Sequence, residues 1–163
     1  MPHITIEYVI MIPVLILQIF LFPLAANWLM NIWVDSRRTL ALQDAASHLG
    51  GTIQQMYFSL NHDAISAGTL TQKSNVPPFI ENYPYTGTAT LSTVLDPALN
   101  SSKVLKITLR LGVAGITVST SVILGQNVEW IESTFVSNST NACIKATKFW
   151  DGDEYIIRLS FGE

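Results

Sequence analysis

The hydrophobic pattern of the chain changes character twice, and the first change comes at Asp35. From Tyr8 to Val34 the sequence holds no Asp, Glu, Lys or Arg. A helix of about 27 residues, rising ~1.5 Å per residue, is roughly 40 Å long and exceeds the ~30 Å hydrocarbon core of a bilayer. Residues 4–34 are therefore predicted to form an apolar helix of membrane-spanning length. This run is about twice as long as the apolar part of a signal peptide, so we expect it to be retained.

Beyond Asp35 the pattern becomes amphipathic, because apolar residues recur at helical spacing between polar ones. Residues 35–60 are predicted to continue the helix and to dock one face on a folded domain. Residues 1–60 would then form a single N-terminal spine helix. The apolar positions that carry the pattern are Leu40, Leu42, Ala45, Ala46, Leu49, Ile53, Met56, Tyr57 and Leu60.

Prolines and glycines interrupt both halves of this expected helix. Pro13 and Pro23 each remove a backbone donor, which predicts local melting or a kink near residues 19–23. The alternative is that the helix tolerates both prolines, as transmembrane helices do. Gly50 and Gly51 are expected to loosen or bend the amphipathic half.

A second change of pattern, near Thr86, replaces the helical period by short alternating stretches rich in Thr, Val, Ile and aromatic residues. Residues 61–85 hold mostly turn and breaker residues and are predicted to be a linker. Residues 86–163 are predicted to form a small antiparallel, sandwich-like β head, so the expected fold class is α+β. The expected strands are 86–95, 104–111, 116–124, 128–136, 142–150 and 155–161, with a hairpin turn at Asp151-Gly152-Asp153.

Composition and motifs argue against several function classes. The formal net charge is −3 and charged residues make up 13% of the chain, so no basic surface for nucleic acid is expected. Cys143 is the only cysteine, which excludes an intrachain disulfide and a thiolate metal cluster. The sequence has no phosphate-binding loop, nucleophile elbow or zinc-protease motif. We therefore expect no cofactor, no metal site and no enzymatic activity.

The first residues resemble the start of a known class of filament subunit. His3-Ile4-Thr5-Ile6-Glu7-Tyr8, followed by a long apolar helix, resembles the N-terminus of type IV pilins. The continuation through Pro13-Val14-Leu15 is similar to the pseudopilins of tight-adherence systems. In plan, a long N-terminal helix joined to a β-rich, often glycosylated domain is similar to archaeal pilins. The resemblance implies a subunit interface along the helix, at Glu7, Tyr8, Ile12, Pro13, Leu17, Phe20, Pro23, Leu24 and Trp28.

Glu7 is the residue to which the resemblance assigns the clearest role. In type IV pilins such an acid lies in the filament core and meets the free amino group of a neighbouring subunit. A carboxylate at the edge of an apolar run is costly unless a cation or donor meets it. The alternative is that Glu7 lies among the lipid headgroups. Only Met1 and Pro2 precede His3, so the sequence starts near its processed form, has a short leader, or is not cleaved.

The resemblance implies a structural subunit of an extracellular, type IV pilus-like helical filament, held in the membrane before the pilus assembly machinery builds it in. Its main partners would be identical subunits, and its role would be assembly, adhesion or surface attachment. Two alternatives are a minor pseudopilin that primes or caps a filament and a single-pass, membrane-anchored surface binding module. Asn100 and Asn138 each begin an N-x-[ST] pattern and are the expected glycosylation sites, in keeping with Ser and Thr at the expected exposed strand positions.

Overall fold

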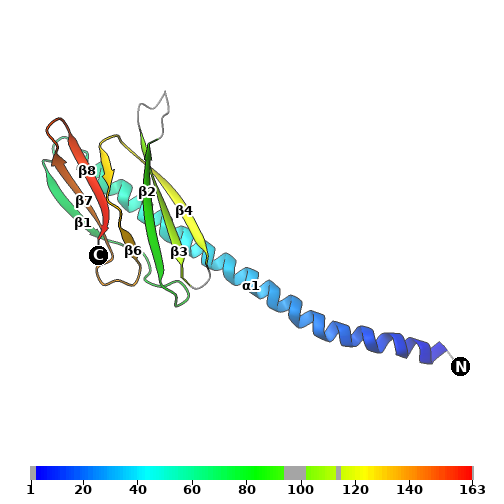
Figure 1. Ribbon diagram of the computed structural model, residues 1–163. Helices are drawn as coiled ribbons and strands as arrows, with labels where there is room; N and C mark the ends of the chain where they lie inside the picture. Colours follow the sequence, from blue (N-terminus) through cyan, green and yellow to red (C-terminus); the bar gives the residue numbers. More distant parts are fainter. Residues whose placement is uncertain (1–2, 94–101, 113–114, 163) are drawn as a thin grey trace. The chain divides into compact units, whose positions relative to one another are not determined.

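The computed structural model describes residues 3–93, 102–112 and 115–162, with side chains from residue 9 onward. Within these residues a single helix, α1 (His3–Leu60), precedes eight strands (Figure 1). The α+β class predicted from the sequence is thereby confirmed. The chain divides into two compact units, Met1–Arg37 and Arg38–Glu163. The strands are β1 (Gly68–Lys73), β2 (Tyr85–Thr93), β3 (Lys103–Leu111), β4 (Thr117–Leu124), β5 (Val128–Trp130), β6 (Thr134–Val136), β7 (Cys143–Trp150) and β8 (Tyr155–Gly162).

The first unit consists of the N-terminal part of α1, which continues without a break through Pro13 and Pro23. Residues 19–23 are α-helical, so the local melting expected there is absent. Each proline removes one N–H donor and leaves the neighbouring backbone bonds of the helix in place. The helix thus continues through both prolines, as transmembrane helices can, and the expected kink stays a prediction.

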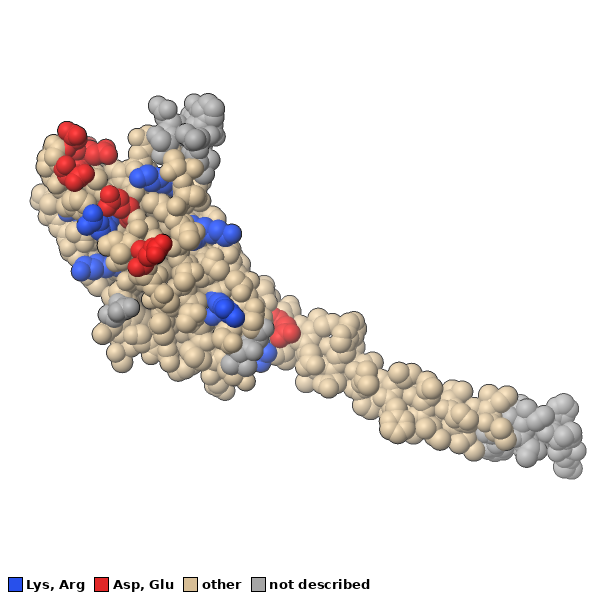
Figure 2. All heavy atoms as spheres, viewed as in Figure 1, with Lys and Arg blue, Asp and Glu red and all other residues tan. Residues whose placement is uncertain are grey.

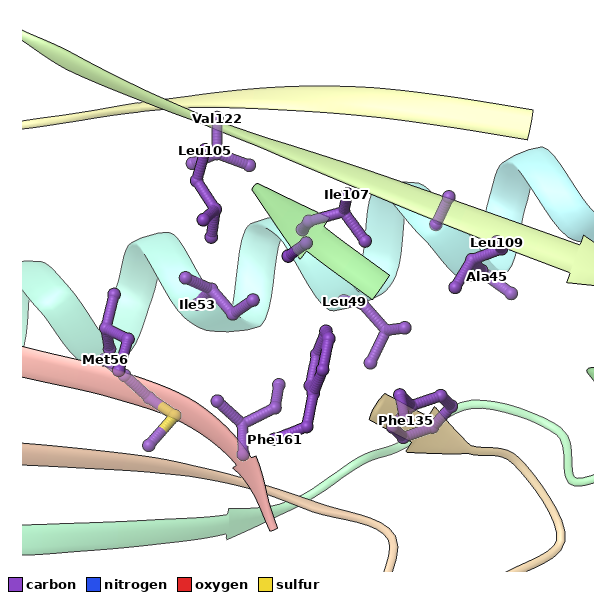
Figure 3. Close-up of a cluster of buried hydrophobic side chains, with 14 of the residues drawn as sticks. Ala45, Leu49, Ile53, Met56, Leu105, Ile107, Leu109, Val122, Phe135 and Phe161 are labelled. Carbon is purple, nitrogen blue, oxygen red and sulfur yellow. The ribbon is translucent and has the colours of Figure 1, made fainter. Parts of the chain in front are cut away.

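The part of α1 that belongs to the second unit buries one face, as the amphipathic pattern predicts. Eight of the nine apolar positions of that pattern are buried, and Leu40 is the exception with 67% of its surface exposed. Leu40 lies nine residues, or two and a half turns, before Leu49 and therefore on the opposite side of the helix from the buried face. Figure 3 shows Ala45, Leu49, Ile53 and Met56 of α1 beside Leu105, Ile107 and Leu109 of β3 and Val122 of β4.

Gly50 allows this close packing instead of loosening the helix. A Cβ atom built on Gly50 would lie 2.9 Å from Cγ2 of Val122, closer than side chains normally approach one another. Gly51, in contrast, is exposed, and a Cβ atom there would have no neighbour within 4 Å. Both glycines are α-helical, and Gly50 brings the helix backbone up to β4, whereas a bend at the pair stays a prediction.

Two four-stranded sheets make up the rest of the second unit, in the orders β1-β7-β8-β5 and β4-β3-β2-β6. Their ladders are antiparallel except for the short parallel pair of β5 with β8. The hydrophobic core draws residues from both sheets and from α1. Phe135 of β6 and Phe161 of β8 join the sheets, with ring centroids 5.5 Å apart. The second unit therefore has a complete core of its own.

The strand pattern departs from the sequence prediction at two places. The stretch 128–136, expected as one strand, is divided into β5 and β6, which belong to different sheets. No glycine or proline marks the break, so turn chemistry could not reveal it. The predicted linker 61–85 contains β1, whose six residues are all exposed. A strand without a buried face lacks the alternation by which strands are recognised in a sequence.

Candidate functional site

The apolar side chains of α1 from Val9 to Trp33 are exposed on every side of the helix. Their exposed fractions run from 48% at Ile32 to 78% at Phe22. Residues 9–34 of α1 contain no Asp, Glu, Lys or Arg, and Figure 2 shows a long stretch of helix without red or blue side chains on the visible face, in contrast to the β-rich unit. Contiguous apolar surface of this extent marks an interaction or membrane surface, because water solvates it poorly. We refer to residues 9–34 as the apolar surface of α1.

Most of the interface residues expected from the sequence lie on this surface. At 3.6 residues per turn, the seven described ones occupy about one half of the helix circumference. The opposite half is equally apolar and includes Leu15, Phe22 and Leu29. Glu7 and Tyr8 belong to α1, but their side chains fall outside the described part. The described residues are Ile12, Pro13, Leu17, Phe20, Pro23, Leu24 and Trp28, all exposed.

The apolar surface ends at an aromatic and charged boundary. The guanidinium of Arg37 lies 5.0 Å from the ring centroid of Trp33, a distance at which cation and ring attract each other. Trp residues are enriched where a transmembrane helix leaves the hydrocarbon, and Arg and Lys side chains reach toward the headgroups there. The sequence prediction did not single out this pair, although its i, i+4 spacing is visible in the sequence.

Shallow grooves and three carboxamides interrupt the apolar surface. One groove is lined by Leu15, Gln18, Ile19, Phe22 and Pro23, where the proline ring and the large side chains leave a recess. Gln18, Asn27 and Asn31 are the polar side chains with an amide group on this surface, and all three are exposed. A groove of this kind can take the side-chain ridge of another helix. The predicted interface set contains none of the three carboxamides.

A hydrogen-bond network fixes the C-terminal end of α1 in the second unit. The Tyr57 hydroxyl donates to Oδ1 of Asn127 at 3.0 Å, and Nδ2 of Asn127 donates to Oδ1 of Asn61 and to the carbonyl of Tyr155. Burial raises the pKa of Tyr57, and a hydrogen bond with the backbone of Gly125 partly offsets this shift. The network connects the helix with the loop before β5 and with the start of β8.

Lys148 of β7 makes a second connection and is almost fully buried, with 4% of its surface exposed. Its Nζ donates to the carbonyls of His62 and Ile65 and lies 4.8 Å from the Tyr155 ring centroid. These contacts occupy the ammonium donors, so the residue holds the segment that follows α1 instead of offering a reactive amine. The alternation of β7, with Ile144 and Ala146 also buried, already placed Lys148 on the inner face.

The outer face of the sheet β4-β3-β2-β6 carries hydroxyl groups. Thr134, Thr88, Thr108 and Ser119 are register partners across all four strands, and the hydroxyls of Thr108 and Ser119 are 3.0 Å apart. The Ser and Thr positions expected to be exposed are thus at the solvent side of this sheet. A hydroxyl surface is solvated readily and needs no protein partner.

The two predicted glycosylation sites differ in what the structure says of them. Asn138 is exposed in the turn between β6 and β7, where an enzyme could reach it. Asn100 lies outside the described residues.

The expected turn at Asp151 is present, with the Asp151 amide donating to the Glu154 carbonyl and Gly152 at φ 102°. Within the described part of the chain, no group of three or more His, Cys, Asp or Glu could hold a metal ion.

By length and composition α1 is able to cross a membrane, and no residue of the most apolar 18-residue stretch in its described part is buried in the fold. One long apolar N-terminal helix followed by a small β domain is an arrangement consistent with pilin-like proteins. No family model, no curated protein and no solved structure matches the chain.

Proposed function

We propose that the chain is the structural subunit of an extracellular, type IV pilus-like helical filament. The observation that carries the proposal is the apolar surface of α1, exposed all around the helix, beside a second unit whose core is complete without it. A helix that is apolar on every side requires apolar neighbours on every side. Lipid supplies them before assembly, and the helices of other subunits supply them afterwards.

Assembly in this mechanism exchanges one apolar environment for another. Each subunit waits in the membrane through residues 9–34, and the assembly machinery extracts it as the same surface is buried against neighbouring helices. The exchange of lipid for helices gains little hydrophobic free energy. Once the filament is outside the membrane, the burial of this surface away from water, at about 25 cal/mol per Å², holds the subunits together. Contacts between unlike surfaces of successive subunits propagate into a helical polymer when the rotation between subunits does not close a ring. The hydroxyl-rich β unit stays in solvent and provides adhesion or surface attachment.

Glu7 gives the first test, because its role differs between a filament subunit and a simple anchor. Replacing Glu7 with Gln removes the charge and keeps the size and a hydrogen-bonding group. We expect Glu7→Gln to reduce the filaments sheared from cells at least tenfold, since the partner charge in the neighbouring subunit loses its counterion. Negative-stain electron microscopy of sheared material, with the amount of membrane-bound subunit as reference, measures this.

Glu132→Gln is the matched control, because Glu132 is an exposed carboxylate of the second unit. It should leave the number of filaments unchanged. Absence of any fibre containing the wild-type chain, with the chain remaining a single copy in the membrane, would refute the proposal and leave a membrane-anchored surface module. Fibres in which this chain occurs only at an end would assign it to the minor, priming class.

A further inference from the structure

Asn27 and Asn31 are two of the three carboxamides in a surface that otherwise suits hydrocarbon, and Gln18 is the third. They are four residues apart, so they lie on the same side of α1, one turn from each other. Both are exposed, and within the described part of the chain neither side chain makes a hydrogen bond. The carboxamide offers two N–H donors and a carbonyl acceptor. Acyl chains can satisfy none of these groups.

The two amides continue a regular stripe of apolar side chains. Positions 17, 20, 24, 27, 31 and 34 alternate spacings of three and four residues, which is the repeat of a helix that packs along a partner helix. Leu17, Phe20 and Leu24 are 60%, 72% and 71% exposed, so the stripe is open to a partner. We call these six residues the amide seam: Leu17, Phe20, Leu24, Asn27, Asn31 and Val34.

Asn27 and Asn31 would lie at different depths in a bilayer, so they differ in their access to headgroups and water. Asp35 is the first charged residue after the apolar run, and the pair of Trp33 and Arg37 marks the boundary. Counting back ~1.5 Å per residue, Asn31 lies about 6 Å and Asn27 about 12 Å inside Asp35. Asn31 can still reach headgroups and water, whereas Asn27 lies among acyl chains. Asn27 therefore has the greater need of a protein partner.

A second copy of this chain fits the seam better than any other occupant. An amide is self-complementary, since it donates and accepts at once, so Asn27 of one copy can pair with the same residue of another. Copies inserted in the same membrane share one orientation, which gives a parallel pair with the seams in register. A single Asn in such a repeat is known to fix register and the number of helices.

We propose that two copies of the chain associate in the membrane as a parallel helix pair through the amide seam, with Asn27 and Asn31 fixing its register. This inference rests on the membrane-embedded stage of the proposed function. It adds a step before assembly, in which subunits are stored as pairs. The hydrogen bonds between amides keep the polar groups away from lipid until the helices enter a filament.

The experiment uses the purified full-length chain in detergent micelles and measures its association constant by sedimentation equilibrium. Asn27→Leu should lower that constant roughly three- to tenfold, and Asn31→Leu should lower it less. Asn27→Gln, which keeps the carboxamide, should recover part of the loss. Gln18→Leu is the matched control, because Gln18 lies two and a half turns before Asn27 and hence on the opposite side of the helix. It should leave the constant within about twofold.

Oxidative cross-linking in vesicles of phosphatidylcholine gives an independent measurement. Cys143 is first replaced by Ser, so that each variant carries one cysteine. Phe20→Cys and Leu24→Cys should form disulfide-linked dimers, whereas Phe22→Cys and Leu29→Cys, on the other side of the helix, should not. A monomeric wild-type chain, or equal cross-linking on both sides, would overturn the proposal, as would an unchanged or tighter association of Asn27→Leu.

Electron microscopy separates failure of this inference from failure of the proposed function. Filaments built from a chain that is monomeric in micelles and vesicles would overturn the seam and leave the filament proposal intact. A seam-dependent dimer from a chain that never forms fibres would support the seam and refute the filament subunit. The Asn27→Leu variant should still form fibres, because neighbouring helices can bury a leucine there.

Discussion

Both halves of α1 carry large apolar side chains, but only the C-terminal half buries them against the rest of the chain. From residue 42 to residue 60 the apolar face of the helix is at most 5% exposed, because the sheets of the same chain cover it. From Val9 to Trp33 the large apolar side chains are at least 48% exposed. One continuous helix thus contains a segment that completes a core and a segment that has none.

The stability of the fold therefore comes from the second unit, whereas the function is expected from the first. The second unit has a hydrophobic core of its own, and the Tyr57 network and the Lys148 contacts fix its polar groups, although Nε1 of Trp130 is buried without a hydrogen-bond partner among the described residues. In the first unit, helical hydrogen bonds pair the backbone N–H and C=O groups without help from any other element. Its side chains require an environment outside the chain. Function is therefore expected where the fold leaves apolar surface uncovered.

Removing the first unit is the strongest test of this contrast. A chain that begins at Arg38 keeps every buried residue of the core, so we expect a folded, soluble monomer with the β signature of the second unit. Membrane binding and filament formation should be lost completely, because both depend on residues 9–34. Flotation with vesicles and circular dichroism measure the two outcomes. A truncated chain that still floats with vesicles would show that the second unit binds membranes by itself.

Much of this contrast could be predicted from the sequence, because it depends on local patterns. An uncharged run and an i, i+3, i+4 repeat identify the two halves of α1 without knowledge of the sheets. The strands with alternating burial, such as β3 and β7, were also expected. In the amphipathic half of α1 and in these strands, burial repeats with the period of the element. In the uncharged half of α1, the large apolar side chains are exposed throughout.

The features that the sequence did not reveal depend on tertiary contacts. β1 is fully exposed and gains its place only by pairing with β7. The break between β5 and β6 follows from the pairing of β5 with β8 and of β6 with β2. In the candidate site, the apolar surface was predictable from the uncharged run, whereas the partner that covers it lies outside the chain.

One substitution, made in each half of α1, sharpens the contrast further. Leu49 is 1% exposed and Leu24 is 71% exposed. Leu49→Ala should lower the free energy of unfolding of the second unit by about 2 to 5 kcal/mol, since it leaves a cavity in the core. Leu24→Ala should change that free energy by less than about 0.5 kcal/mol. Urea unfolding of the full-length chain in mild detergent, followed by near-ultraviolet circular dichroism, measures both.

Filament yield should respond to the substitution in the N-terminal half of α1, which leaves the free energy of unfolding nearly unchanged. Leu24→Ala is expected to reduce filament yield, because the side chain belongs to the apolar surface, while retaining the unfolding midpoint of the wild-type chain. If Leu24→Ala destabilised the second unit as strongly as Leu49→Ala, the two halves of α1 would form one cooperative structure, and the separation of stability from function would be wrong.

The glycine pair provides the smallest and most local test. Gly51→Ala should stabilise the second unit by about 0.5 to 1 kcal/mol, because alanine favours helix and its Cβ atom meets open space. Gly50→Ala gains the same propensity, but its Cβ atom would lie 2.9 Å from Cγ2 of Val122. Overpacking of this kind costs about 1 to 3 kcal/mol, which exceeds the gain. We therefore expect the two substitutions to have opposite signs.

Val122→Ala supplies the control, because it removes the methyl group that the new Cβ atom of Gly50→Ala would meet. Combined with Gly50→Ala, it should cost less than the sum of the two single changes, a coupling that a double-mutant cycle measures by urea unfolding. Additive effects would show that α1 does not approach β4 as closely as the buried glycine indicates. The docked half of the helix would then be held by its side-chain contacts alone, without close approach of its backbone to the sheet.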